Sequence, residues 1–277
     1  MVILNREDVI LTVDSVPKSM NTMADAAFGA HPGRWPLPPA RTVEQHWHRA
    51  VAAGGQGRYA VALAELDAID RAPGGPVPSL ALSTRASFLR QLGRHVDARG
   101  WDGRALAVAG GNADARADAL IGLAADALGV GRFALSARLL ARAGDVVDEA
   151  ASARLPVRFA WVSAELAMFT GQGAASVGHA ERAVASAAQL GSVRHAVKSD
   201  VVLAAAFCSA GFAERSRQIA DAAVEAAERH GLVPLTWALA CLLGDIGSAS
   251  RSPDAIAALR ASCTGVVRDR GGVWSSR

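Results

Sequence analysis

The chain has 277 residues, of which 51% are hydrophobic but only 5% aromatic, so its core must be built mainly from Ala, Leu and Val. The formal net charge is +3, and the basic residues form no Lys/Arg-rich run, which argues against nucleic acid as the partner. Three widely spaced cysteines argue against a disulfide framework or a zinc site. They are typical of the cytoplasm, where we expect the protein to act. No uncharged stretch approaches the roughly 20 residues of a membrane span, so we expect no membrane partner.

Residues 1–41 differ in composition from the rest and are predicted to form an irregular, Pro-containing N-terminal arm. Within it, Val9–Val13 indicates a short strand or an extended segment, and Trp35–Pro39 cannot be helical because proline restricts its neighbours. We expect this arm to dock on the protein's own surface or on a second copy, with Trp35 as the anchor. A disordered tail, or a start at Met20 or Met23, is the alternative.

From residue 42 onward the chain repeats itself at intervals of 36 to 40 residues. A glycine marks each repeat, at Gly57, Gly93, Gly131, Gly171, Gly211 and Gly247. Seven positions before each glycine stands an alanine, at Ala50, Ala86, Ala124, Ala164, Ala204 and Ala240, and five positions after it a small residue, at Ala62, Ala98, Ser136, Ser176 and Ser216. A fixed period of this length is typical of stacked repeats, in which each unit buries its face against its neighbours.

The repeat is predicted to be helical, because alanine has the highest helix propensity and β-branched runs are few. The glycine and proline breaks divide the chain into twelve expected helices. They span 42–54, 59–72, 79–92, 95–109, 113–129, 133–149, 156–170, 174–190, 193–210, 213–230, 235–246 and 253–268. We therefore expect an all-α fold of about six helix-turn-helix hairpins over 42–268, followed by a C-terminal tail at 269–277.

The sequence at the turns is similar to a known family. Gly57-Arg58-Tyr59-Ala60-Val61-Ala62 and Gly131-Arg132-Phe133-Ala134-Leu135-Ser136 place an aromatic residue two positions after the glycine and a small residue five positions after it. This resembles the tetratricopeptide repeat (TPR). The period exceeds the roughly 34 residues of that family, and so it looks more like the longer, degenerate repeats in sensor regions of large bacterial transcription regulators. The resemblance covers about residues 42–268. It implies a right-handed α-solenoid whose first helices line a concave, peptide-binding groove.

Within this register, the positions ten and six before the turn glycine are expected to face the groove. Three of the six tryptophans share the first of these positions. With nearby basic residues, the candidate groove consists of Trp47, Val51, Ser83, Ser87, Arg90, Ile121, Arg158, Trp161, Glu165, Lys198, Val201 and Trp237. Exposed apolar surface of this kind usually marks a binding site. The alternative is that the tryptophans are core residues at contacts between repeats.

No pattern predicts an enzyme, a cofactor or a metal site. His46 and His48 are two positions apart, so on a helix they point to different sides. The acids of Asp145–Glu149 lack a second acidic motif, and no nucleophile elbow or glycine-rich phosphate loop is present. We therefore expect a non-enzymatic adaptor or regulatory module that binds an apolar helix or peptide of another protein, and a homodimer is a further option. A transcription-linked regulator acting through nucleic acid or a small-molecule signal is the alternative.

Overall fold

The computed structural model describes residues 18–70 and 75–275, and within them it contains thirteen α-helices and no strand. The helices are α1 (Lys18–Phe28), α2 (Val43–Gly55), α3 (Tyr59–Asp67), α4 (Pro76–Gln91), α5 (His95–Val108), α6 (Ala113–Gly129), α7 (Phe133–Val147), α8 (Arg154–Phe169), α9 (Gly173–Leu190), α10 (Val193–Ser209), α11 (Ala213–Arg229), α12 (Val233–Ile246) and α13 (Pro253–Asp269). The expectation of an all-α fold is confirmed. None of these helices is both long and apolar enough to cross a membrane.

The twelve helices expected after residue 42 correspond to α2–α13, and the largest difference is at the end of α3, which stops at Asp67 instead of residue 72. The prediction that residues 1–41 form an irregular arm is wrong in part, because residues 18–28 form the helix α1. This helix buries one narrow face, made of Met23, Ala26 and Ala27, against α2. The segment expected to be extended at Val9–Val13 lies outside the described residues.

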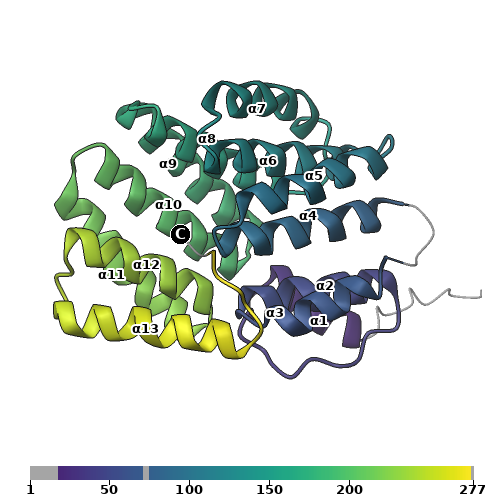
Figure 1. Cartoon of the computed structure of the whole chain (residues 1–277), viewed down its shortest axis with the longest axis horizontal. Coiled ribbons are helices and arrows are strands. Elements are labelled where there is room, and N and C mark those ends of the chain that lie inside the picture. The colour runs from purple at the N-terminus through teal and green to yellow at the C-terminus, as the bar shows by residue number, and fades with distance from the viewer. Residues whose placement is uncertain (1–17, 71–74, 276–277) are drawn as a thin grey trace, which may run out of the picture.

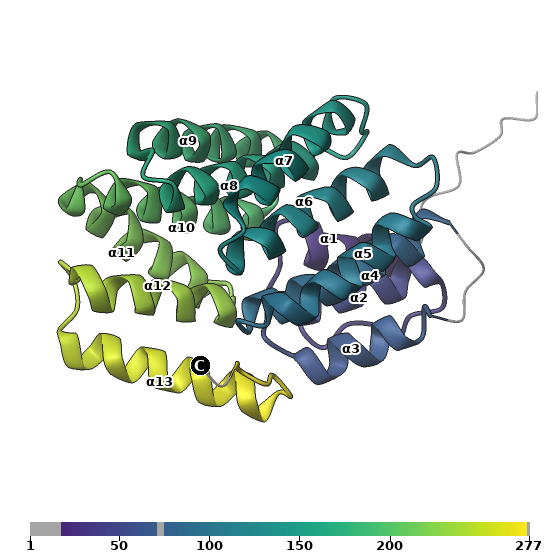
Figure 2. The same ribbon diagram turned by 45° about the horizontal axis from the view of Figure 1, so that its top comes forward.

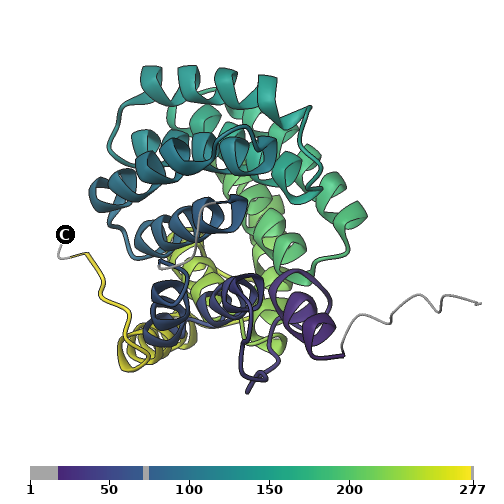
Figure 3. The same cartoon turned by 90° about the vertical axis from the view of Figure 1, so that its right-hand side faces the viewer.

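Helices that follow one another pack in pairs, and every second helix also contacts the next but one. Contacts join α2 to α4, α4 to α6, α6 to α8, α8 to α10 and α10 to α12, so these even-numbered helices form a continuous layer. The odd-numbered helices from α3 to α13 each pack against the even-numbered helix before them. Figure 3 shows that the helices follow a curved path, along which the C-terminal helices come back to the N-terminal helices.

The recurrent residues explain why each pair can pack closely. The six turn glycines all have positive φ, between 73° and 87°, a conformation that residues with a Cβ rarely adopt. The six alanines that precede them are at most 1% exposed, and the small residues that follow them are fully buried. In one pair the Oγ of Ser216 on α11 donates a hydrogen bond to the carbonyl oxygen of Ala204 on α10 at 2.7 Å. Small side chains at these positions let the two helices approach.

The segment that follows the last helix returns to the first two helix pairs and contacts them through hydrogen bonds. The amide of Ala60 at the start of α3 donates to the carbonyl of Arg270 at 2.9 Å, and the Arg270 guanidinium donates to the carbonyl of Gln56 at 2.7 Å. The amide of Ser275 donates to the carbonyl of Leu92 at 2.8 Å. Figures 1 and 2 show the end of α13 reaching the start of α3. The array of helices is therefore closed rather than open-ended.

The described part of the N-terminal arm completes this closure. The Trp35 ring packs near Leu37 and Ala52, and the guanidinium of Arg58 lies 4.7 Å from its ring centroid. The amide of Val193 at the start of α10 donates to the carbonyl of Gly29 at 3.1 Å. From residue 18 onward the arm thus docks on the protein's own surface, with Trp35 at the contact.

Candidate binding site

A cavity of about 490 Å³ lies among the even-numbered helices. Its wall is formed by side chains of α4, α6, α8, α10 and α12, together with residues at the ends of α2 and the start of α5. Eight of the twelve residues expected in the groove line it: Ser87, Arg90, Ile121, Arg158, Trp161, Glu165, Lys198 and Trp237. Most of the expected groove residues therefore lie around one partly open cavity.

The other four expected groove residues lie in the core and not on this wall. Trp47 is 8% exposed, and its indole N–H donates to Thr84 Oγ1 at 2.9 Å. The physical reason is α1, which was not predicted: its Phe28 ring lies 5.2 Å from the Trp47 ring and covers that end of the groove. Val51 belongs to the same buried cluster, and Val201 packs into the cluster formed by α10, α11 and α12. Ser83 is 1% exposed.

Trp161 and Trp237 place two indole rings on the cavity wall, and both are half-buried, whereas the Phe169 ring on the same wall is exposed. The indole N–H of Trp161 donates to Ser199 Oγ at 2.9 Å, and that of Trp237 donates to Thr264 Oγ1 at 3.0 Å. His195 stacks on Trp161 with the ring centroids 5.5 Å apart. Because the two polar N–H groups are already paired within the protein, what these indoles offer to a ligand is apolar ring surface.

Behind the wall, two buried carboxyl groups share one arginine. Arg90 Nη1 donates to Asp126 Oδ1 at 2.9 Å and also to Asp102 Oδ2. Burial, together with the neighbouring Asp126, raises the pKa of Asp102 to about 7 against the opposing charge of Arg90. The Asp102 carboxyl sits directly against Gly122, where an added Cβ would lie only 2.3 Å from Oδ2. Glycine at this position of α6 therefore makes room for the buried acid.

A third buried carboxyl group, that of Asp118, pairs with two arginines of α8. The Arg154 guanidinium donates to its two oxygens at 3.1 Å each, in a two-pronged pair, and Arg158 Nε lies 3.0 Å from Oδ1. Burial alone would raise the pKa of Asp118, but the charges of Arg154 and Arg158 overcome this effect and hold the pKa below its ordinary value. The contact of Arg158 Nε is an ion pair by distance only, since that buried N–H has no hydrogen-bond acceptor.

Sequence reasoning missed Arg194, which also lines the cavity. No described carboxylate pairs with it, and the one hydrogen bond of its side chain goes to the carbonyl of Ala27 on α1 at 3.3 Å. Burial lowers the pKa of Arg194 to about 10, and the charges of Arg158 and Arg154 contribute to this. A signal was present in the register: Arg154 and Arg194 both stand 17 positions before their turn glycines, Gly171 and Gly211.

The cavity wall consequently carries more basic than acidic groups. Four basic side chains line it, namely Arg90, Arg158, Arg194 and Lys198, against the single carboxylate of Glu165, which lies 3.4 Å from Lys198 Nζ. The buried acids Asp102, Asp118 and Asp126 are not on the wall. His195 is buried, and burial together with the neighbouring arginines lowers its pKa well below the ordinary value, so it adds no charge at neutral pH.

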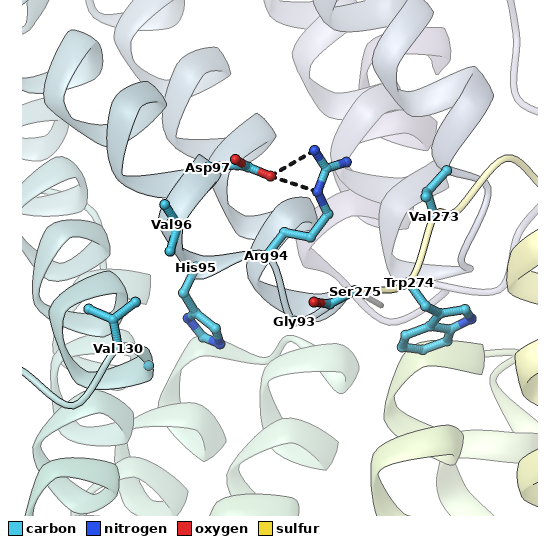
Figure 4. A pocket seen from close by; sticks show the side chains of 10 residues that line it. Gly93, Arg94, His95, Val96, Asp97, Val130, Val273, Trp274 and Ser275 are labelled. Carbon is cyan, nitrogen blue, oxygen red and sulfur yellow. Dashed lines mark hydrogen bonds and ion pairs between the residues drawn. The ribbon is translucent and has the colours of Figure 1, made fainter. Parts of the chain in front are cut away.

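A second cavity of about 500 Å³ adjoins the first and shares His95 and Gly129 with it. Figure 4 shows its two sides, with Val130 opposite Trp274 and Ser275 of the C-terminal segment. Its one charged pair, Arg94 with Asp97 at 2.7 Å, is exposed and neutralised within α5 and its turn. The first cavity is the better candidate because buried charges and aromatic rings converge on it.

A search of protein-family models finds none that matches the chain, and a search of curated proteins finds no similar sequence. Within the described residues no three His, Cys, Asp or Glu side chains are grouped as a metal site. The charge and the aromatic rings of the central cavity are therefore the basis for a functional proposal.

Proposed function

We propose that the chain is a TPR-like, right-handed α-solenoid of about six hairpins that acts as a non-enzymatic adaptor or regulatory module. It binds a short segment of another protein in the central cavity, with an apolar side chain of that segment against Trp161 and Trp237. The observation that carries this proposal is the convergence of these two indole rings, from α8 and α12, on one partly open cavity. Aromatic side chains in such positions contribute a large share of binding energy at protein interfaces.

The volume of the cavity and the closure of the helix array limit the size of the ligand that can enter the cavity. A cavity of about 490 Å³ is of the size that usually encloses a small ligand or a few side chains. Because Arg270, directly after α13, ties the end of the array to the start of α3, a long helix cannot lie along an open groove. The proposed occupant is therefore a peptide end or a single turn of helix, rather than the extended amphipathic helix suggested by an open solenoid.

The cavity volume and the closure of the array also support a second candidate function, in which a small-molecule signal occupies the cavity and the protein is a regulator. Enclosure on several sides and a mixture of aromatic and charged groups are typical of small-molecule sites. The two candidates differ in what the purified protein retains: a polypeptide in the first case, and a compound of low molecular mass in the second.

The test is affinity capture from cell lysate with three forms of the protein as bait: the unaltered chain, Trp161→Ala and Trp101→Ala. Trp101 on α5 is the matched control, because it is a half-buried tryptophan between Arg85 and Arg104 and does not line the cavity. Loss of Trp161 should weaken partner binding by ~2 kcal/mol, about 30-fold, as for other aromatic residues at the centre of an interface. Trp101→Ala should leave capture unchanged.

Circular dichroism of each bait separates loss of binding from loss of folding. Trp237→Ala, which removes the second ring from a different helix, should give the same result as Trp161→Ala. Equal capture by the unaltered and Trp161→Ala baits contradicts the proposal. Unfolding of both tryptophan variants contradicts it too, because the rings would then be core residues.

A further inference from the structure

We infer that the central cavity binds an oxyanion of its ligand, a carboxylate or phosphate group, against Arg158, Arg194 and Lys198. This inference rests on the proposal that the cavity is the binding site, and it adds the chemistry of the group that is recognised. It begins with the distribution of charge around the cavity.

The basic groups are on the wall, and most of the acids that balance them are behind it. Arg90 is held from behind by Asp102 and Asp126, and Asp118 is shared between Arg154 and Arg158. One carboxylate shared by two guanidinium groups leaves one positive charge in excess, whereas the two carboxyl groups on Arg90 leave one negative charge in excess when both are ionised. Arg194 adds a further positive charge, for which the described residues provide no carboxylate. A ligand in the cavity consequently meets an excess of positive charge in surroundings of low dielectric constant, where its effect is strong.

Two buried donors have no acceptor in the described structure. The Nε atoms of Arg158 and Arg194 are both inaccessible to solvent and without a hydrogen-bond partner. Buried donors of this kind are rare, since leaving one unpaired costs free energy that folding does not recover. Both side chains line the cavity through atoms other than these buried Nε, so an oxyanion placed there would compensate the guanidinium charge that the protein leaves unpaired.

The backbone of α2 is shaped around Arg194. Gly55, at the end of α2, also lines the cavity, and a Cβ at this position would lie 3.0 Å from Arg194 Cδ. On its other side the Arg194 guanidinium lies 5.9 Å from the Phe28 ring centroid and donates to the carbonyl of Ala27. Helices α1 and α2 thus hold the stem and one nitrogen of the guanidinium, and the remaining donors are left for a ligand. Guanidinium is suited to carboxylate and phosphate because its planar array of donors matches their oxygens.

The third group, Lys198, links the anion position to the aromatic wall. Lys198 Nζ lies 5.8 Å from the Trp161 ring centroid and 3.4 Å from Glu165 Oε1. Glu165 partly neutralises Lys198, so Arg194 remains the strongest uncompensated cation. The favoured ligand therefore has an oxyanion near Arg194 and an apolar or aromatic body that reaches the face of Trp161.

The experiment measures binding of three simple probes by isothermal titration calorimetry in low salt. Inorganic phosphate tests the anion position alone, and phenyl phosphate and phenylacetate add the same aromatic body to a phosphate and to a carboxylate. We expect the aromatic probes to bind roughly tenfold more tightly than inorganic phosphate, and added NaCl to weaken all binding. The more tightly bound of the two aromatic probes identifies the oxyanion.

Arg194→Gln should lower the affinity for the better probe by roughly tenfold or more, as expected when a charge-assisted hydrogen bond is lost. Arg142→Gln is the matched control, since Arg142 is an exposed arginine of α7 that does not line the cavity. It removes the same charge and should change the affinity less than about twofold. Arg194→Lys retains the charge, and it should recover part of the affinity if Arg194→Gln folds poorly.

The outcomes separate this inference from the proposed function. No binding of any probe up to about 10 mM, or equal losses for Arg194→Gln and Arg142→Gln, overturns the anion site. If the protein partner still binds Arg194→Gln normally but not Trp161→Ala, the anion site is wrong and the protein-binding function stands. If the probes bind in an Arg194-dependent way and Trp161→Ala captures the partner normally, the anion site stands and the proposed function is wrong.

Discussion

Two serines at the same position of different repeats should respond in opposite directions to replacement by alanine. Ser136 on α7 and Ser216 on α11 both follow their turn glycine by five positions, and both are fully buried. The hydroxyl of Ser216 donates to the carbonyl oxygen of Ala204 at 2.7 Å, whereas the hydroxyl of Ser136 has no hydrogen-bond partner among the described residues. In the first two repeats this position is already alanine, at Ala62 and Ala98.

The expected magnitudes follow from these contacts. Ser216→Ala removes one hydrogen bond, and the Ala204 carbonyl keeps its partner within α10, so the free energy of unfolding should fall by ~1 kcal/mol. Ser136→Ala removes a buried hydroxyl whose desolvation is not compensated, so the free energy of unfolding should rise by ~1 kcal/mol. At about 2–4 °C per kcal/mol for a domain of this size, the two variants should differ in Tm by roughly 4–8 °C.

Urea unfolding at equal m-values, with Tm as a second measurement, tests this difference. Ser176→Ala is an internal reference, because the Ser176 hydroxyl bonds to the Gly173 carbonyl of its own helix, at 2.7 Å. If Ser136→Ala destabilises the protein as much as Ser216→Ala does, the Ser136 hydroxyl has a partner that this packing does not provide, and the reasoning fails.

Asp102→Asn should flatten the dependence of stability on pH. The pKa of Asp102 is about 7 in the folded protein against an ordinary 3.8, so folding takes up a proton in this window, and the contribution of Asp102 to stability falls as the pH rises from about 4 to 7. Tm values measured across this range should show a shallower fall for the variant, and an unchanged slope would contradict the assignment. Phe28→Ala should lower the free energy of unfolding by ~2 kcal/mol, since Phe28 makes ring contacts with Trp47, His48 and His195. It should also shift tryptophan emission to longer wavelength, whereas unchanged stability and emission would mean that α1 does not cover Trp47.

The repeat register predicted the helical pairs because the signal is local. A glycine with positive φ at the turn and small residues where two helices touch are requirements of each pair by itself, so they are visible in the sequence. Helix α1 was missed because its buried face is only Met23, Ala26 and Ala27, a pattern too short to stand out beside the prolines of the arm. Its stability comes from packing against α2, which no local pattern contains.

The site was predicted in part for a related reason. The register placed Trp161 and Trp237 on a common face, and the structure brings both to the cavity. It could not show that Trp47, at the equivalent position, would be covered by Phe28 from outside the repeat. Arg194 was overlooked because it stands near the start of α10, whereas the register selected positions nearer the end of each helix. Which turn of a helix faces the cavity depends on how strongly the array curves. That curvature is set by all repeats together.

The closed array has a consequence for how the protein folds. In an open repeat array each unit interacts only with its neighbours, so the terminal units fray first and unfolding can spread from either end. Here the contact of Arg270 with Gln56 spans 214 positions of the chain, and it makes the first and last pairs neighbours. Fraying at one end therefore removes contacts from the other. Contacts between such distant positions slow folding, because most of the chain must be ordered before they form. The protein should consequently unfold as one cooperative unit, with slower folding than an open array of the same length.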